Sequence, residues 1–234
     1  RRDWTVAEIQ ALHDAPLFEL VERAHGVLLE GQPRNAVQLC TLLSVKTGGC
    51  PEDCAYCAQS VRHGVVRPEP LAEVEHVTAR ARLARDRGAT CFCVGTAWRG
   101  VREGAGFERV LEMVREIKAL GLVACATLGL VGLEQARRLR EAGLDCYNHN
   151  LDTSPEYFPR ISSTRRFEDR LQTLGHLSAA GIRVCSGGII GMGESVADRS
   201  SMLRELGRLE PHPYTVPINA LVPIPGTPLV EWLR

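Results

Sequence analysis

The chain has 234 residues, 28 of them basic and 28 acidic, so its formal net charge is zero. A neutral chain has no global electrostatic attraction to nucleic acid or to an anionic membrane, and no stretch approaches the ~18 consecutive apolar residues of a membrane span. We therefore expect a cytoplasmic, small-molecule protein of one main domain, with neither nucleic acid nor membrane as a partner.

The first part of the chain, residues 1–36, is predicted to be an N-terminal helical extension. Two helices are expected there, with Asp3 and Thr5 as candidate caps. The second helix has apolar residues at helical spacing, namely Leu17, Leu20, Val21, Ala24, Val27 and Leu28. An amphipathic stripe of this kind favours a helix that covers part of the main domain.

A short apolar run from Leu39 to Val45 predicts a buried strand, and a loop with three cysteines follows it. Cys50, Cys54 and Cys57 have the spacing C-x3-C-x2-C. Thiolates this close in sequence bind Zn, Cu(I) or an iron–sulfur cluster. A structural zinc site normally adds a second cysteine or histidine pair, which is missing here. A 4Fe-4S cluster held by three cysteines would leave one iron open to another ligand.

After this loop, an amphipathic helix, a glycine and a short apolar strand recur in order. The predicted units span 71–94, 107–126, 133–148 and 167–186, and a last helix near 195–209 leads to a strand near 214–221. Helices that alternate with strands predict a parallel sheet. Counting the strand before the cysteine loop, we expect an α/β fold over residues 37–234: a TIM-type (β/α)8 barrel truncated to about six βα units.

Three predicted strands carry a cysteine at nearly the same depth: Cys93, Cys125 and Cys185. Side chains that point into a parallel barrel form layers drawn from different strands, so these thiols could hold a second metal centre. For any one buried cysteine, a role as a small apolar core residue is the simpler interpretation. The remaining cysteines are predicted to be ordinary core residues: Cys40, Cys91 and Cys146.

Polar residues follow the fourth strand of the repeating pattern. Period-two alternation places Asn148, Asn150 and Asp152 on one face of the chain. Barrel interiors are mostly apolar, so a polar set at the end of a strand predicts ligand binding, whereas a turn or cap would explain Asp152 alone. His149, on the opposite face, is predicted to be a core histidine with satisfied hydrogen bonds rather than a metal ligand.

Three further features belong to the later strands and helices. The segment 187–194 contains four glycines, which allow either a ligand close to the backbone or simply a tight turn. Asn219 is a polar residue near a predicted strand end and is either a site group or a cap. Arg170, near the start of a helix, could reach inward, although most arginines on helices are solvated.

Taken together, these residues resemble the radical S-adenosylmethionine (SAM) enzymes, whose cluster motif is C-x3-C-x2-C with an aromatic residue before the third cysteine. Within that superfamily, the run Cys-Pro-Glu-Asp-Cys-x-Tyr-Cys-x-Gln-Ser at 50–60 is similar to the biotin synthase family, as are 147–155, 184–194 and 217–219. The resemblance covers nearly the whole chain. It implies a radical SAM sulfurtransferase that inserts sulfur into dethiobiotin to form biotin.

The resemblance also implies a role for each candidate residue. The 4Fe-4S cluster that cleaves SAM would be held by Cys50, Cys54 and Cys57. The 2Fe-2S cluster that donates sulfur would be held by Cys93, Cys125 and Cys185. SAM contacts are expected at Tyr56, Gly95, Thr96, Ala97, Asp152, Arg170 and Ile189. Dethiobiotin contacts are expected at Asn148, Asn150 and Asn219.

Partners follow from the same resemblance, which implies an electron donor such as flavodoxin or ferredoxin and a homodimer. It further implies C-terminal βα units, with an arginine ligand for the 2Fe-2S cluster, that residues 1–234 do not contain and that we expect turnover to need. The alternatives are another radical SAM enzyme with the same barrel, an inactive fragment, and a zinc-stabilised binding protein.

Overall fold

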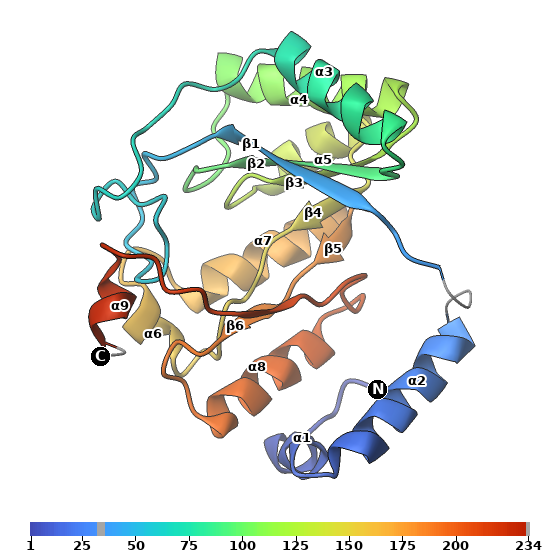
Figure 1. Ribbon diagram of the computed structural model, residues 1–234, viewed down its shortest axis with the longest axis vertical. Coiled ribbons are helices and arrows are strands. Elements are labelled where there is room, and N and C mark those ends of the chain that lie inside the picture. The colour runs from blue at the N-terminus through green and yellow to red at the C-terminus, as the bar shows by residue number, and fades with distance from the viewer. Residues whose placement is uncertain (32–35, 233–234) are drawn as a thin grey trace.

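The computed structural model describes residues 1–31 and 36–232, which form a curved parallel sheet with helices along its outer face (Figure 1). Five strands pair in chain order and all are parallel: β1 Cys40–Lys46, β2 Cys91–Thr96, β3 Val123–Thr127, β4 Cys146–Asn148 and β5 Arg183–Cys185. Two further strands, β6 Gly188–Ile190 and β7 Ile218–Ala220, form a second parallel pair. The predicted parallel α/β architecture is confirmed.

The structure differs from the sequence prediction after the fifth predicted strand, β5, because a further strand, β6, forms within the glycine-rich segment 187–194. The break between β5 and β6 falls at Gly187, where an added Cβ would lie 1.8 Å from the carbonyl oxygen of Pro217. Only a glycine allows the backbone to approach its neighbour so closely. An isolated bridge between Cys185 and Thr215 keeps the two parts of the sheet in contact. The described residues therefore contain seven strands instead of six.

The helices of the described residues are α1 Val6–His13, α2 Leu17–Gly31, α3 Val74–Asp86, α4 Ala105–Ala119, α5 Leu133–Glu141, α6 Phe158–Ile161, α7 Phe167–Ala179, α8 Val196–Arg208 and α9 Pro228–Trp232. The sequence did not predict α6 and α9, because four or five residues are too few for a helical period. None of the described helices is both long and apolar enough to cross a membrane.

The strands have two different faces, as period-two alternation requires. Phe92 and Val94 of β2 are fully buried in the core beneath the outer helices. Cys91 and Cys93 alternate with them and belong to a separate buried group on the other side. The sheet therefore turns its apolar residues toward the helices and its cysteines toward the concave face.

The two N-terminal helices differ in how they pack: α1 contacts the main domain, and α2 has no buried residue. Thr5 caps α1 in a capping box with Glu8, as its sequence position predicted, and α1 packs on α8 with Ile9 buried. Asp3 instead forms an ion pair with Arg1. The predicted apolar stripe of α2 does not cover the described part of the chain, since no residue of this helix is buried. Residues 32–35, which end the predicted extension, lie outside the described residues.

Candidate active site

The three motif cysteines lie in a loop at the end of the sheet where the parallel strands terminate, near α6 and α9 (Figure 1). The loop begins with Gly48, whose φ of 66° favours glycine. Its own backbone hydrogen bonds then hold it, because the Cys50 amide donates to the Gln59 carbonyl at 3.0 Å and the Cys57 amide to the Cys54 carbonyl at 2.9 Å. The loop is therefore compact despite its lack of regular secondary structure.

A cavity of about 230 Å³ opens beside this loop and joins it to the polar segment after β4. Its lining includes Cys50, Cys54, Tyr56, Cys57, Thr96, Ala97, Asn148, His149, Asn150, Asp152, Arg165 and Arg170. Segments separated by about 100 residues thus meet at one place. In (β/α)8 folds, this end of the strands is where ligands bind.

Three residues predicted to contact SAM or the substrate do not line the cavity. Gly95 lies within β2, and Ile189 packs in an apolar cluster that Tyr56 also contacts. Asn219 is exposed in the middle of β7 rather than at a strand end. β7 is shorter than the predicted strand and pairs with β6, and a substrate contact at Asn219 stays a prediction.

Asp152 is the centre of the polar contacts in the cavity. The Tyr56 hydroxyl donates a hydrogen bond to its carboxylate at 2.5 Å, and the Arg170 guanidinium forms an ion pair with it. Arg170 also donates to the Asn150 carbonyl at 2.5 Å, and its side chain is buried. The alternatives of a turn-capping Asp152 and a solvated Arg170 are therefore wrong.

The backbone of Asp152 is unusual as well. Its φ of 69° makes it the one non-glycine residue with positive φ in the described part of the chain. A non-glycine residue in this conformation stores strain that its surroundings must offset. Here the Ile189 amide donates to its carbonyl at 2.7 Å. The backbone therefore aims the carboxylate into the cavity at the expense of local stability.

Some polar atoms of the cavity have no partner within the chain. Nε2 of His149 and Oγ1 of Thr96 are buried without a hydrogen bond. A buried polar atom left unpaired costs about 1–3 kcal/mol, which a polar ligand in the cavity would offset. Burial lowers the pKa of His149 well below its ordinary value, so the ring is neutral. The prediction that His149 is buried is confirmed, but the prediction that its hydrogen bonds are satisfied is wrong for Nε2.

The donor set of the loop fits an iron–sulfur cluster. Burial raises the pKa of Cys54 to about 11 and also raises the pKa of Cys57, so both thiols stay protonated unless a metal competes for them. No three or more His, Cys, Asp or Glu side chains of residues 1–31 and 36–232 are placed to hold a single metal ion.

The strand cysteines form a second group on the concave face. Cys93 and Cys125 are directly opposite each other in the β2–β3 register, and with Cys91 and Cys146 they pack in one buried group. Contact with Cys93 and burial raise the pKa of Cys125. The equal depth predicted for these two cysteines therefore agrees with the register.

Cys185 and Cys40 are placed differently. Cys185 is opposite Asn148 in the β4–β5 register and so lies two residues beyond the level of Cys125 and Cys146. Strand tilt in a barrel produces such an offset between side chains of one layer. Cys40 is exposed, with its Sγ 2.9 Å from Sγ of Cys91. Its prediction as a core residue is wrong, because β1 is the edge strand of the five-stranded sheet.

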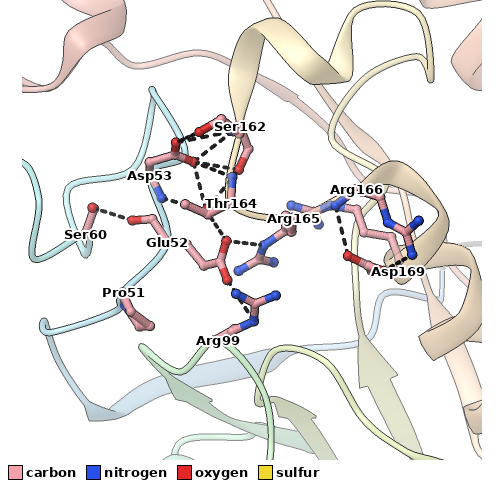
Figure 2. Close-up of polar contacts among 12 residues, drawn as sticks. Pro51, Glu52, Asp53, Ser60, Arg99, Ser162, Thr164, Arg165, Arg166 and Asp169 are labelled. Carbon is pink, nitrogen blue, oxygen red and sulfur yellow. Dashed lines mark hydrogen bonds and ion pairs between the residues drawn. The ribbon is translucent and has the colours of Figure 1, made fainter.

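Sequence reasoning missed the two acidic residues between the first two cysteines. Figure 2 shows the buried Glu52 carboxylate between two guanidinium groups, with Nε of Arg99 at 3.2 Å and Nε of Arg165 at 3.1 Å. Asp53 accepts hydrogen bonds from the segment 162–164, including the Ser163 amide at 3.0 Å. The presence of two carboxylates between metal-binding cysteines was itself a signal in the sequence. Buried carboxylates at such a place need cationic or hydrogen-bonding partners, although the sequence does not show which residues supply them.

Comparison with known proteins identifies the group to which these features belong. The family model of the radical SAM superfamily matches residues 44–206. The chain is 62% identical over 230 residues to a biotin synthase of Sorangium cellulosum, covering 98% of this chain and 66% of that protein. It is 57% identical to a biotin synthase of Myxococcus xanthus, covering 100% of this chain and 68% of that protein.

A solved structure extends the likeness to the fold. Methylornithine synthase superposes with a TM-score of 0.79 at 20% identity, covering 96% of this chain and 66% of that one. At this identity the likeness concerns the fold alone. The chain spans about two thirds of the length of the curated relatives described above.

Proposed function

The chain belongs to the radical SAM superfamily and, within it, to the biotin synthase family, and from this we propose that it carries the SAM-cleaving site of an enzyme that converts dethiobiotin to biotin. One observation supports this above all: the three motif cysteines and the Asp152–Arg170 pair line the same cavity. A radical enzyme needs its cluster and its SAM side by side.

We assign Cys50, Cys54 and Cys57 to a 4Fe-4S cluster and the other end of the cavity to SAM. When bound, the cluster supplies the electron that cleaves SAM to methionine and a 5′-deoxyadenosyl radical, which takes hydrogen from the substrate. The residues of the chain bind and orient SAM and the substrate, and they exclude water from the cavity. We assign Arg170 to the SAM carboxylate and Asp152 to the ribose hydroxyls; the support is that the two residues form an ion pair in the lining of the cavity.

The strand cysteines suit the second centre of this family. We assign Cys93, Cys125 and Cys185 to a 2Fe-2S cluster, which supplies the sulfur atom when bound. The support is their place on the concave face, with Cys93 and Cys125 buried among other thiols. Such surroundings keep water from a carbon radical formed nearby.

Between the two cysteine groups lie amides that suit a neutral substrate. Asn148 and Asn150 line the cavity, and Nδ2 of Asn148 lies 3.7 Å from Sγ of Cys185. Amides offer directional hydrogen bonds to a ureido ring without a charge that must be desolvated. We therefore assign these two residues to dethiobiotin, whereas Asn219 is exposed on β7 and is not among the residues that line this cavity.

The partners of this function are proposals in the same way. A flavodoxin or ferredoxin would deliver the electron, and the relatives' family makes a homodimer the expected assembly. The test is anaerobic reconstitution with iron and sulfide, followed by measurement of bound iron, labile sulfide, 5′-deoxyadenosine and biotin. Iron with labile sulfide and SAM cleavage would support the proposal, and biotin formed from dethiobiotin would separate it from another radical SAM activity. Zinc without labile sulfide would contradict it.

A further inference from the structure

The acidic residue Glu52 stands beside the first two motif cysteines with two cationic partners. Its carboxylate is 2% exposed and pairs with both Arg99 and Arg165. The adjacent Asp53 carboxylate is held by hydrogen bonds from the segment 162–164 instead of by an arginine. The two guanidinium groups and the two carboxylates balance in number, as do Asp152 and Arg170. The field at the thiolates of the loop therefore depends on how buried each charge is and how close it lies to them.

Among these charges Arg165 acts most strongly on the thiolates, because the arginines around the loop differ in exposure. The Arg165 side chain is 7% exposed and lines the cavity with Cys54, whereas Arg99 is 47% exposed. Arg166, the next residue, is 78% exposed and pairs with Asp169 (Figure 2). Water and salt screen exposed charges far more than buried ones, so Arg165 exerts the largest field on the loop.

The segment just before Arg165 is held by hydrogen bonds to the cysteine loop. The Thr164 hydroxyl donates to the Glu52 carboxylate, and the Thr164 amide donates to Asp53 at 3.2 Å. The Ser162 hydroxyl adds a further hydrogen bond to Asp53 at 2.9 Å. The two acidic residues of the motif thus bind the segment that carries Arg165, and the ion pair with Glu52 keeps its guanidinium beside the loop.

We propose that Arg165, positioned by Glu52, is the residue whose charge favours the reduced form of the 4Fe-4S cluster held by Cys50, Cys54 and Cys57. This inference rests on the proposed function. Reduction adds one electron to an already anionic cluster, and a nearby buried cation stabilises the more negative state. Arg165 thereby eases the delivery of the electron that SAM cleavage requires.

The test measures the reduction potential of the cluster in the reconstituted protein. Electron paramagnetic resonance monitors the reduced cluster during a redox titration without SAM. Arg165→Met is expected to lower the reduced-to-oxidised ratio at a fixed potential about tenfold, which equals about 59 mV for a one-electron couple. Arg165→Lys keeps the charge and should stay near the parent value. Arg99→Met should shift the potential less, and Arg166→Met, the matched control, should not shift it.

Two outcomes would overturn the inference. The first is a parent-like potential of Arg165→Met in the titration without SAM; if a shift then appears only after SAM is added, Arg165 acts on the SAM carboxylate instead. If Arg165→Met and Arg165→Gln take up no iron or sulfide, Arg165→Lys decides. Cluster uptake by the lysine variant supports a role of the charge, and its failure, the second outcome, would mean that Arg165 is needed only for the loop's structure.

These results are separable from the proposed function. A parent protein that holds a cluster and cleaves SAM, with the potential of Arg165→Met unchanged, leaves the function in place and contradicts this inference alone. A parent protein without iron and labile sulfide would contradict both.

Discussion

The two cysteine groups of this chain are held in place by different means. The loop cysteines depend on side chains from distant segments, such as the hydrogen bonds from 162–164 to Asp53 and the ion pair of Glu52 with Arg165. The strand cysteines Cys93 and Cys125 are placed by the backbone ladder between β2 and β3. A change of one side chain can therefore misplace the loop, whereas the strand positions survive such a change.

The electrostatic surroundings of the two groups differ as well. Arg165 and Arg170 line the cavity beside the loop cysteines, so anionic ligands meet compensating charge there. Cys93 and Cys125 have other thiols as their close neighbours. A centre that must accept an electron and bind a charged cofactor benefits from the first environment. A centre that meets a neutral carbon radical is better placed in the second.

Loss of a loop cysteine should have the largest effect. We expect Cys54→Ser to abolish the formation of 5′-deoxyadenosine from SAM, because the 4Fe-4S cluster would lose one of three protein ligands and the chemistry belongs to that cofactor. Iron and sulfide analysis with product chromatography would measure this. Cys40→Ser is the control, since Cys40 is exposed and outside the cavity lining. A Cys54→Ser protein that still cleaves SAM would contradict the ligand assignment.

Loss of a strand cysteine should affect biotin formation but not SAM cleavage. In a protein extended by the C-terminal βα units that the family resemblance implies, Cys93→Ala is expected to retain SAM cleavage and to lose biotin formation, because the loop and its charged partners are untouched. The β2–β3 ladder keeps the strand in place, so the unfolding free energy should change by only about 1 kcal/mol. Cys146→Ala, in the same buried group but not assigned to the cluster, is the matched control. If Cys93→Ala lost both activities equally, the loop cysteines and the strand cysteines would not have the separate roles proposed for them.

A change at Asp53 tests the side-chain support of the loop. Burial opposes the charged form, but hydrogen bonds from Ser163, Thr164 and Ser162 hold the pKa of Asp53 well below its usual range. Asp53→Asn should lower the unfolding free energy by about 2–3 kcal/mol at pH 7, because charged hydrogen bonds are lost. Denaturant unfolding measures this loss.

The loss of unfolding free energy in Asp53→Asn should depend on pH, because it comes from the charge of Asp53. A depressed pKa in the folded state stabilises the protein above the unfolded pKa of about 3.9, and this stability fades as the pH falls toward the folded pKa. The difference between Asp53→Asn and the parent should therefore be full at pH 7 and shrink below about pH 4. Asp86→Asn, at an exposed ion pair, should change stability by less than about 0.5 kcal/mol at either pH. A pH-independent difference would show that the charge of Asp53 is not what holds the loop.

The contrast between loop and strands also explains what the sequence could predict. Periodicity located the strands that carry Cys93 and Cys125, because alternation and helix stops are local signals. The contacts of Glu52 with Arg99 and Arg165 join segments 47 and 113 residues away, and no local pattern encodes such pairs. The exposure of Asn219 depended on which strand runs beside β7, a feature of the whole sheet.

The smallest expected effect lies on the strand side, at Tyr147 of β4. Its buried hydroxyl donates to the Gly129 carbonyl at 2.8 Å and accepts from the Leu128 amide at 2.9 Å, which fixes the chain just beyond β3. Tyr147→Phe leaves both backbone groups unpaired and should lower the unfolding free energy by about 1–2 kcal/mol. Calorimetry would measure this, with Tyr214→Phe as the exposed control. Iron and sulfide content should stay at the parent level, because the backbone ladder alone keeps the strand cysteines in place; a loss of the 2Fe-2S signal would show that they too depend on a single side chain.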